Sequence, residues 1–150
     1  MSEAVLERTA SRRRPVHLWV VGILSLLWNS FGAFDYLATK LKLDFYVSQF
    51  TEAQRAYFYS FPSWAVAAWA LGVWGAFAGS VGLLLGRGWA VWAFAVSLAG
   101  LAVNTVYSFG MSEGADIMGS AGVGMTAFIW LVALALLAYA VKQRQRGVLR

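Results

Sequence analysis

Four long stretches of the sequence are apolar and almost free of charge, and shorter polar segments separate them. They run from about 16 to 36, 63 to 86, 88 to 109 and 119 to 141, and each holds 20 or more residues. An α-helix of that length rises about 1.5 Å per residue and crosses a hydrocarbon core of roughly 30 Å. Spanning β-strands would instead give alternating segments of about 10 residues. The pattern predicts an all-α integral membrane protein, in which residues 1–150 form one antiparallel bundle of four transmembrane helices.

Small residues recur along one side of the second stretch, and we call this row the glycine seam. Its members are Ala65, Ala68, Gly72, Gly75, Gly79, Gly82 and Gly86, spaced alternately by 3 and 4. Glycine weakens a helix by about 1 kcal/mol relative to alanine, so several on one face indicate close helix packing. We expect this packing within one bundle. The alternative is homodimerisation through Gly75-x-x-x-Gly79 and Gly82-x-x-x-Gly86.

The other three stretches carry small or polar rows with a similar spacing. The rows are Gly22, Ser25, Asn29, Gly32, Tyr36 and Thr39; Ala90, Ala93, Ser97, Gly100, Asn104 and Tyr107; and Gly119, Gly122, Thr126, Ile129, Ala133, Leu136 and Ala140. A repeat of about 3.5 residues favours left-handed crossing near +20°, so we expect all four rows to face one bundle axis. Little more than Arg87 links the second and third stretches, which predicts that these helices are antiparallel neighbours.

The connection between the first two stretches, residues 40–62, is long and rich in aromatic residues. Within it, Thr51 and Gln54 have the spacing of a capping box, in which each side chain bonds to the backbone of the other residue. This predicts a short helix from about Glu52 to Ser60 that ends before Pro62. Aromatic side chains are typical of membrane interfaces, so we expect this helix to lie at the periplasmic interface or to cap the bundle.

Lysine and arginine are distributed unevenly between the two sides of the predicted bundle. One side has Arg8, Arg12, Arg13, Arg14, Arg87, Lys142, Arg144, Arg146 and Arg150, and the other has Lys40, Lys42 and Arg55. The positive-inside rule then predicts a bacterial inner-membrane protein with both termini in the cytoplasm. These anchoring residues account for the net charge of +5, so nucleic acid is not an expected partner. The expected partners are the lipid bilayer and either further copies of the chain or a larger membrane complex.

The composition restricts the chemistry that the chain offers. Cysteine is absent and His17 is the only histidine, which excludes thiolate ligands and a bis-histidine haem site within one chain. The sequence shows no nucleophile–base–acid set and no paired carboxylates within the four stretches. We therefore expect no enzymatic activity, no metal and no cofactor, and we interpret His17 as an interfacial polar residue.

Polar and aromatic side chains gather in the predicted periplasmic half of the bundle, where polar groups are costly and therefore mark candidate sites. The candidate ligand-binding residues are Trp28, Asn29, Asp35, Tyr36, Trp64, Trp69, Asn104, Tyr107 and Ser108. One interpretation is a periplasm-facing pocket for a small neutral, sugar-like solute or for a lipid or quinone head group. In the other, Asn29 and Asn104 hydrogen-bond each other, worth about 0.6–2 kcal/mol, and Asp35 is solvated or pairs with Lys40 or Arg55.

Several short runs of this sequence resemble a group of small proteobacterial four-span membrane proteins. The runs are 28–36, 50–54, 61–64, 69–75 and 79–80, within a region of resemblance covering roughly residues 17–110. Some members are labelled sugar transporters, and the plan is broadly similar to that of small DoxX-type four-helix proteins. The resemblance favours a transporter or binder of a small solute. If the protein is a transporter, we expect an oligomer, because four short, closely packed helices cannot enclose a wide pore. The alternative function is a non-enzymatic accessory protein that packs against a larger membrane complex or lipid.

Overall fold

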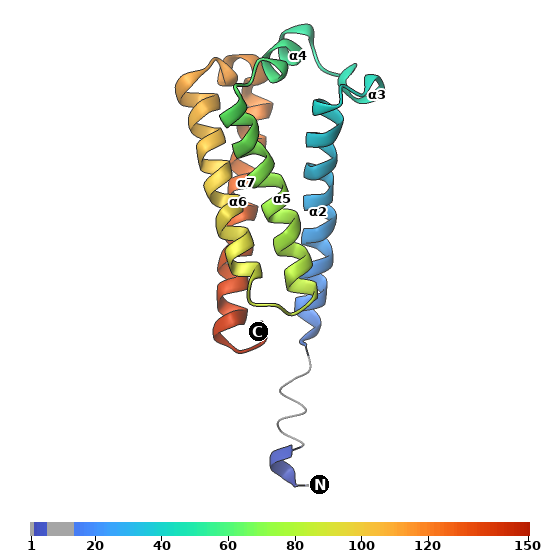
Figure 1. Ribbon diagram of the computed structural model, residues 1–150, viewed down its shortest axis with the longest axis vertical. Coiled ribbons are helices and arrows are strands. Elements are labelled where there is room, and N and C mark those ends of the chain that lie inside the picture. The colour runs from blue at the N-terminus through green and yellow to red at the C-terminus, as the bar shows by residue number, and fades with distance from the viewer. Residues whose placement is uncertain (1, 6–13) are drawn as a thin grey trace.

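The computed structural model describes residues 2–5 and 14–150, and these contain helices and no strand. The long helices are α2 (Val16–Lys40), α5 (Ser63–Leu84), α6 (Ala90–Val106), which η1 (Tyr107–Met111) continues, and α7 (Gly114–Gln145). They run side by side (Figure 1), and all four spans are long and apolar enough to cross a membrane. Helices suit that environment because each satisfies its own backbone hydrogen bonds where lipid offers none. The prediction of an all-helical chain with four helices of spanning length is confirmed.

The helices differ from the predicted stretches mainly at their ends. α2 continues beyond Tyr36 to Lys40, and α7 begins at Gly114. The backbone of α7 breaks at Gly119, where φ is +70°, so the regular helix begins close to the predicted position. The third span ends in the π-helical turn η1, a rare form of helix that occurs often at functional sites. Periodicity alone predicted neither the break nor the π-helical turn.

α5 is followed by Gly86, whose backbone has a left-handed conformation. Arg87 donates its N–H to the Gly82 carbonyl (2.9 Å), and Gly86 donates to the Leu83 carbonyl (3.0 Å), which is the Schellman pattern. Gly86 has a φ of +68°, a conformation that favours glycine. The expectation that Gly86 belongs to the packing face of the helix is therefore wrong, because this residue lies beyond the last turn and ends it.

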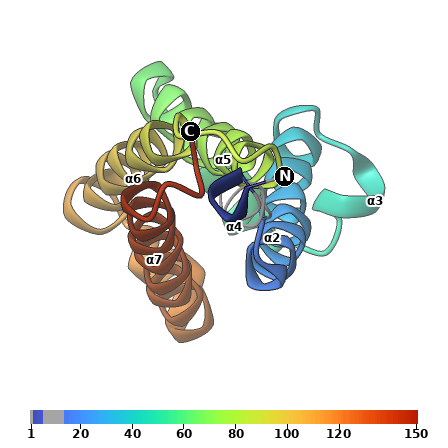
Figure 2. The same cartoon turned by 90° about the horizontal axis from the view of Figure 1, so that it is seen from below.

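α5 occupies the centre of the helix arrangement. α2 packs on one side of it and α6 on another, while α7 packs on α6. Seen along the helices, the four form an arc in which α2 and α7 are the two ends (Figure 2). The expectation that all four rows face one axis is not met, since the rows of α2 and α6 both face α5.

The glycine seam, as far as Gly82, brings the backbone of α5 against α6. A Cβ added at Gly75 would lie 3.0 Å from the Ala93 carbonyl oxygen, and one added at Gly100 would lie 2.6 Å from the Ala68 carbonyl oxygen. Ser97 Oγ donates across the same contact to the Gly72 carbonyl at 2.6 Å. The seam thus packs closely against α6 within the chain, and the two helices are antiparallel neighbours. α6 covers the face that homodimerisation through Gly75 and Gly79 would need.

One end of the molecule, the α4 end, carries α3 (Asp44–Val47), α4 (Glu52–Tyr59) and the connection between η1 and α7. Both bonds of the predicted capping box are present: Gln54 N donates to Thr51 Oγ1 at 3.1 Å, and Thr51 N donates to Gln54 Oε1 at 3.0 Å. The Tyr57 hydroxyl lies 2.8 Å from Ser112 Oγ, which ties α4 to the start of α7. The predicted short helix is present as α4, and its position at a membrane interface stays a prediction. α3 was not predicted.

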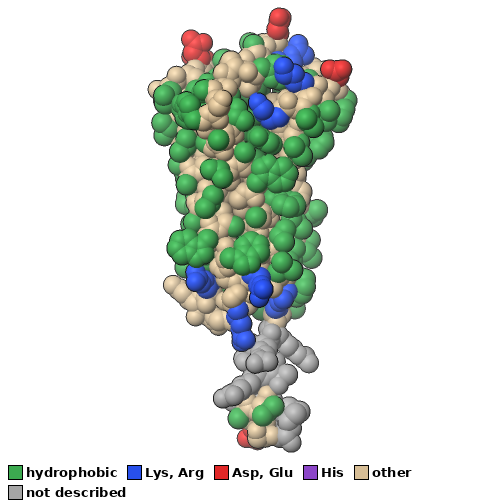
Figure 3. All heavy atoms as spheres, viewed as in Figure 1, with side chains coloured by type: hydrophobic (Ala, Val, Ile, Leu, Met, Phe, Trp, Pro, Cys, Tyr) green, Lys and Arg blue, Asp and Glu red, His purple; other side chains and the backbone are tan. Residues whose placement is uncertain are grey.

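The opposite end, the terminal end, joins Arg14, the α5–α6 loop and the segment 146–150. Arg14 donates to the Leu84 and Leu85 carbonyls, and the backbone of Arg150 exchanges hydrogen bonds with Gly86 and Gly88. On the face shown in Figure 3, charged side chains gather at both ends and an apolar band lies between them. Of the predicted anchors, Arg8, Arg12 and Arg13 lie outside the described residues.

Candidate functional site

A cavity of about 420 Å³ lies between α2 and α7, with α5 and α6 behind it. Its walls are mostly apolar and aromatic. Phe58 of α4 and Phe61, which follows that helix, line it toward the α4 end. Phe94 and Leu136 line its other end, where they belong to the buried cluster that also contains Leu18 and Leu83. The cavity therefore ends at a packed core on its terminal side.

The mouth of the cavity opens sideways between α2 and α7. Phe31 and Met125 line the cavity although their side chains are 65% and 52% exposed, so they mark its edge. Contacts that join α2 to α7 lie further toward the terminal end, where the Trp28 and Phe128 ring centroids are 5.3 Å apart. In a bilayer, a mouth on this apolar flank faces lipid.

The cavity brings together six of the nine predicted ligand-binding residues. These are Trp28, Asn29, Asp35, Trp69, Asn104 and Ser108. The other three are not in the lining. Tyr36 packs edge-on against Trp69 with ring centroids 4.9 Å apart, and Trp64 and Tyr107 pack against each other at 5.3 Å. They support the aromatic cluster around the cavity instead of facing its space.

Asn29 and Asn104 bond to α5 and not to each other. Asn29 Nδ2 donates to Ser80 Oγ at 2.8 Å and to the Ala76 carbonyl at 3.2 Å. Asn104 Nδ2 donates to the Ala65 carbonyl at 3.5 Å. The interpretation that the two amides pair is wrong, because α2 and α6 pack on α5 and each amide reaches the α5 surface nearest to it. Both nevertheless line the cavity.

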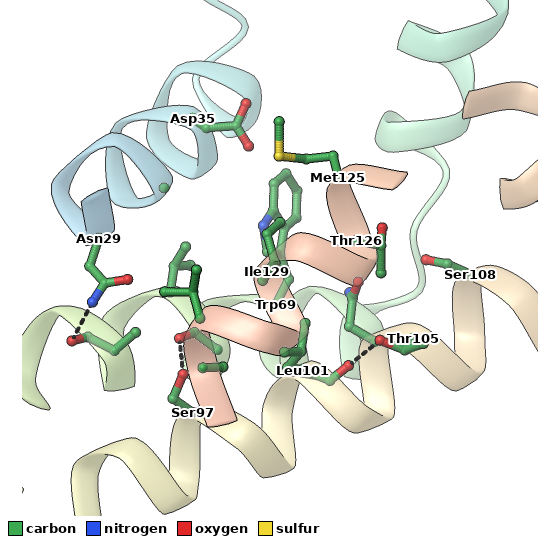
Figure 4. A pocket seen from close by; sticks show the side chains of 18 of the residues that line it. Asn29, Asp35, Trp69, Ser97, Leu101, Thr105, Ser108, Met125, Thr126 and Ile129 are labelled. Carbon is green, nitrogen blue, oxygen red and sulfur yellow. Dashed lines mark hydrogen bonds between the residues drawn. The ribbon is translucent and has the colours of Figure 1, made fainter. Parts of the chain in front are cut away.

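Asp35 is the one carboxylate in the lining. The Tyr46 hydroxyl of α3 donates to its Oδ1, and no ion pair with Lys40 or Arg55 forms within the described chain. Burial, together with the hydrogen bond to Asp35, raises the pKa of the Tyr46 phenol, so this phenol keeps its proton at neutral pH and remains the donor. Figure 4 shows the carboxylate of Asp35 turned across the cavity toward Met125 of α7.

Most polar hydrogens of the lining are already used inside the protein. Ser97, Thr105 and Thr126 donate to the carbonyls of Gly72, Leu101 and Gly122. Toward the cavity, Asn29 Oδ1 and the second oxygen of Asp35 remain as acceptors. The Ser108 hydroxyl, one Nδ2 hydrogen of Asn104 and the indole N–H groups of Trp28 and Trp69 remain as donors. In the part of the chain that the structure describes, no group of three or more His, Asp or Glu side chains is arranged to hold a metal ion.

Several lining residues were not among the predicted ones. Thr126 lies on the predicted row of the fourth helix, so that row was the signal that could have found it. Phe109 belongs to η1, whose wider turn changes the helical register, and Phe58 and Phe61 come from the long connection. A spacing of 3 and 4 residues along a helix therefore could not predict Phe58, Phe61 or Phe109.

Comparison of the chain with protein-family models, with curated proteins and with solved structures finds no match. The resemblance to small proteobacterial four-span proteins and to DoxX-type proteins therefore stays a prediction. No residue role transfers from a relative, and the function has to be argued from the cavity itself.

Proposed function

We propose that this protein is a multi-pass membrane protein that binds a small amphiphilic molecule in the cavity between α2 and α7. The observation that carries the proposal is the cavity: apolar and aromatic walls, a few polar groups, and a mouth on the apolar flank. Its volume of about 420 Å³ lies within the range typical of small-molecule sites. The ligand enters from the bilayer between Phe31 and Met125.

An amphiphile suits this cavity better than the sugar-like solute that the sequence suggested. A sugar has hydroxyl groups around its whole surface, and each hydroxyl that is buried without a partner weakens binding. Here the side-chain hydrogens of Ser97, Thr105 and Thr126 are already used, and most of the wall is hydrocarbon. The geometry thus favours the lipid-like alternative, with a polar head near Asp35 and an apolar body beside α7.

We also propose that the terminal end faces the cytoplasm of a bacterial inner membrane. This end carries six of the described cations: Arg14, Arg87, Lys142, Arg144, Arg146 and Arg150. The positive-inside rule supports that orientation. Because the chain lacks cysteine, single cysteines at the exposed residues Ser48 and Gln145 report the two sides. An impermeant maleimide should label S48C and not Q145C in intact spheroplasts; the reverse pattern would reverse the orientation.

Photolabelling in phosphatidylcholine nanodiscs tests the binding function. Diazirine derivatives of dodecanol and of dodecyltrimethylammonium serve as probes, and mass spectrometry compares labelling of Ile129 in the lining with labelling of lipid-facing Leu131. Ala133→Phe fills the cavity from α7, whereas Ala135→Phe adds the same ring on the exposed face. We expect Ala133→Phe to lower Ile129 labelling at least about fivefold, equivalent to roughly 1 kcal/mol of binding.

Ala135→Phe is the control for the labelling of Ala133→Phe. Ala135→Phe should leave the ratio of Ile129 to Leu131 labelling unchanged. If neither probe prefers Ile129, or if the two phenylalanine variants behave alike, the cavity is not a binding site. That outcome would favour the alternative function, an accessory protein that packs against a larger membrane complex or lipid.

A further inference from the structure

The cavity contains a carboxyl group without a basic partner. Its lining includes Asp35 but no Lys, Arg or His. The hydrogen-bond partner of Asp35 is the neutral phenol of Tyr46. A carboxylate at membrane depth is costly, and such residues usually pair with an opposite charge or serve a ligand. A ligand that brings a positive charge would complete the pair.

Aromatic rings surround the same space. Trp69 lines the cavity, and its ring is fixed by neighbours whose centroids lie 4.9 Å (Tyr36), 5.8 Å (Phe61) and 6.2 Å (Phe58) away. Trp28 lines the cavity from α2 and is held against Phe128. Tryptophan faces attract cations more strongly than other rings do, and aromatic cages recognise quaternary ammonium groups. The rings are therefore placed to accept a cation before any ligand arrives.

Two free acceptors of the lining suit the same class of ligand. Asn29 uses both Nδ2 hydrogens on α5, so its Oδ1 remains as an acceptor. Asp35 accepts from Tyr46 at Oδ1, and its other oxygen remains free toward the cavity (Figure 4). A protonated amine carries donors and no acceptor, which complements this set.

The distribution of charge along the molecule also favours a cation near Asp35. The α4 end carries four acidic residues and three basic ones. The acidic residues are Asp44, Glu52, Glu113 and Asp116, and the basic ones are Lys40, Lys42 and Arg55. The terminal end instead has a cluster of arginines and lysines. The electrostatic potential is therefore more negative on the side where Asp35 lies, which attracts cationic ligands to the cavity and away from the opposite end.

We propose that the cavity selects lipophilic organic cations, in which a protonated or quaternary amine lies beside Asp35 and an apolar body extends along α7. Asp35 acts as the counter-ion, and Trp28 and Trp69 supply aromatic faces. The inference rests on the proposed function, since the same cavity must bind a small molecule, and it adds the charge of that molecule and the residue that selects it.

The experiment compares the two photolabels, which share a dodecyl chain and differ in their head group. Zwitterionic nanodiscs are used so that the lipid itself does not concentrate cations, and labelling is normalised to the amount of probe in the bilayer. In the wild-type protein, we expect the ammonium probe to label Ile129 about tenfold more strongly than the alcohol does. Asp35→Asn keeps an oxygen that accepts from Tyr46 but removes the charge, so it should abolish the preference for the ammonium probe over the alcohol.

Asp44→Asn is the matched control, because Asp44 is exposed on α3 and lies outside the lining. It should retain the preference for the ammonium probe. Equal labelling by both probes in the wild-type protein would overturn the cation proposal while leaving the amphiphile site in place. The same holds if Asp35→Asn lowers both probes equally. If neither probe labels Ile129, the proposed function itself is overturned, and this comparison in the wild-type protein requires no variant to fold.

Discussion

The contact between α5 and α6 and the space between α2 and α7 show two opposite uses of residue size. At the first, glycines and serines let two backbones meet, as at Gly75, Gly100 and Ser97. At the second, the aromatic side chains of Trp28 and Phe128 join the helices at one level and leave a cavity of about 420 Å³ beside them. Both regions are lined by residues spaced alternately by 3 and 4. The spacing alone therefore does not predict whether two helices pack closely or leave a cavity between them.

The difference lies in what faces each row. The small residues of α5 lie directly against α6. A Cβ added at Gly75 would strike the α6 backbone, and one added at Gly79 would strike the Phe94 ring of α6. The small residues of α7, such as Gly122 and Ala133, face the cavity instead. Where rows of small residues on two helices meet, the helices pack closely. Where a row of small residues faces a distant helix, no large side chain fills the space between them and a cavity remains. The seam is thus the rigid wall against which the cavity is built.

The largest expected effect comes from filling the closed side. A methyl group at Gly100 would lie 2.6 Å from the Ala68 carbonyl oxygen and 2.7 Å from the Gly72 nitrogen, so Gly100→Ala has to separate two backbones. We expect a loss of about 2–3 kcal/mol in the free energy of unfolding, measured by titration with denaturing detergent from mixed micelles.

Gly124→Ala is the matched change, at an exposed position of α7 outside the cavity lining. Nothing lies within 4 Å of a Cβ at Gly124, so the variant should gain up to about 1 kcal/mol from helix propensity alone. The two alanine substitutions should therefore have opposite signs. Equal effects would show that the α5–α6 contact is not close-packed.

The sequence was sufficient to predict features that depend on local patterns. The four spanning helices follow from length and hydropathy, the capping box from the spacing of Thr51 and Gln54, and the α5–α6 pair from a link too short for any other arrangement. Each of these follows from backbone hydrogen bonding or chain connectivity. No tertiary information is needed for them.

The remaining features depend on which helix meets which. Asn29 and Asn104 lie at corresponding places in their rows, but α5 accepts the hydrogen bonds of both, which no spacing rule indicates. Gly86 continues the seam in sequence, yet the helix ends before it. The partner of Asp35 comes from α3, an element of four residues with no periodic signal. Six of the nine predicted ligand-binding residues line the cavity. Polar residues at membrane depth usually point toward other helices or a cavity and away from lipid, which explains why the sequence could indicate them.

A smaller effect is expected from the hydrogen bonds that hold α2 and α6 to α5. Asn29 is 8% exposed and makes two bonds to α5, so Asn29→Ala should lower the free energy of unfolding by about 1 kcal/mol, near the upper values measured in membrane proteins. Asn104 makes one bond of 3.5 Å, and Asn104→Ala should cost less than about 0.5 kcal/mol. The same detergent titration measures both. A reversed order would mean that the α6 contact depends on its amide and the α2 contact does not.

A small effect on stability, and the most direct probe of the open side, is expected at the Trp28–Phe128 pair. Phe128 is 50% exposed, so Phe128→Ala should cost about 0.5–1 kcal/mol through the lost ring contact. The same change widens the mouth between α2 and α7, so the initial rate of photolabelling at Ile129 should rise. Phe77→Ala is the control, because Phe77 packs on Trp74 with centroids 5.9 Å apart and neither residue lines the cavity. Phe77→Ala should lower the free energy of unfolding by a similar amount without changing the rate of photolabelling at Ile129. Equal rates in the two variants would mean that ligands do not enter between α2 and α7.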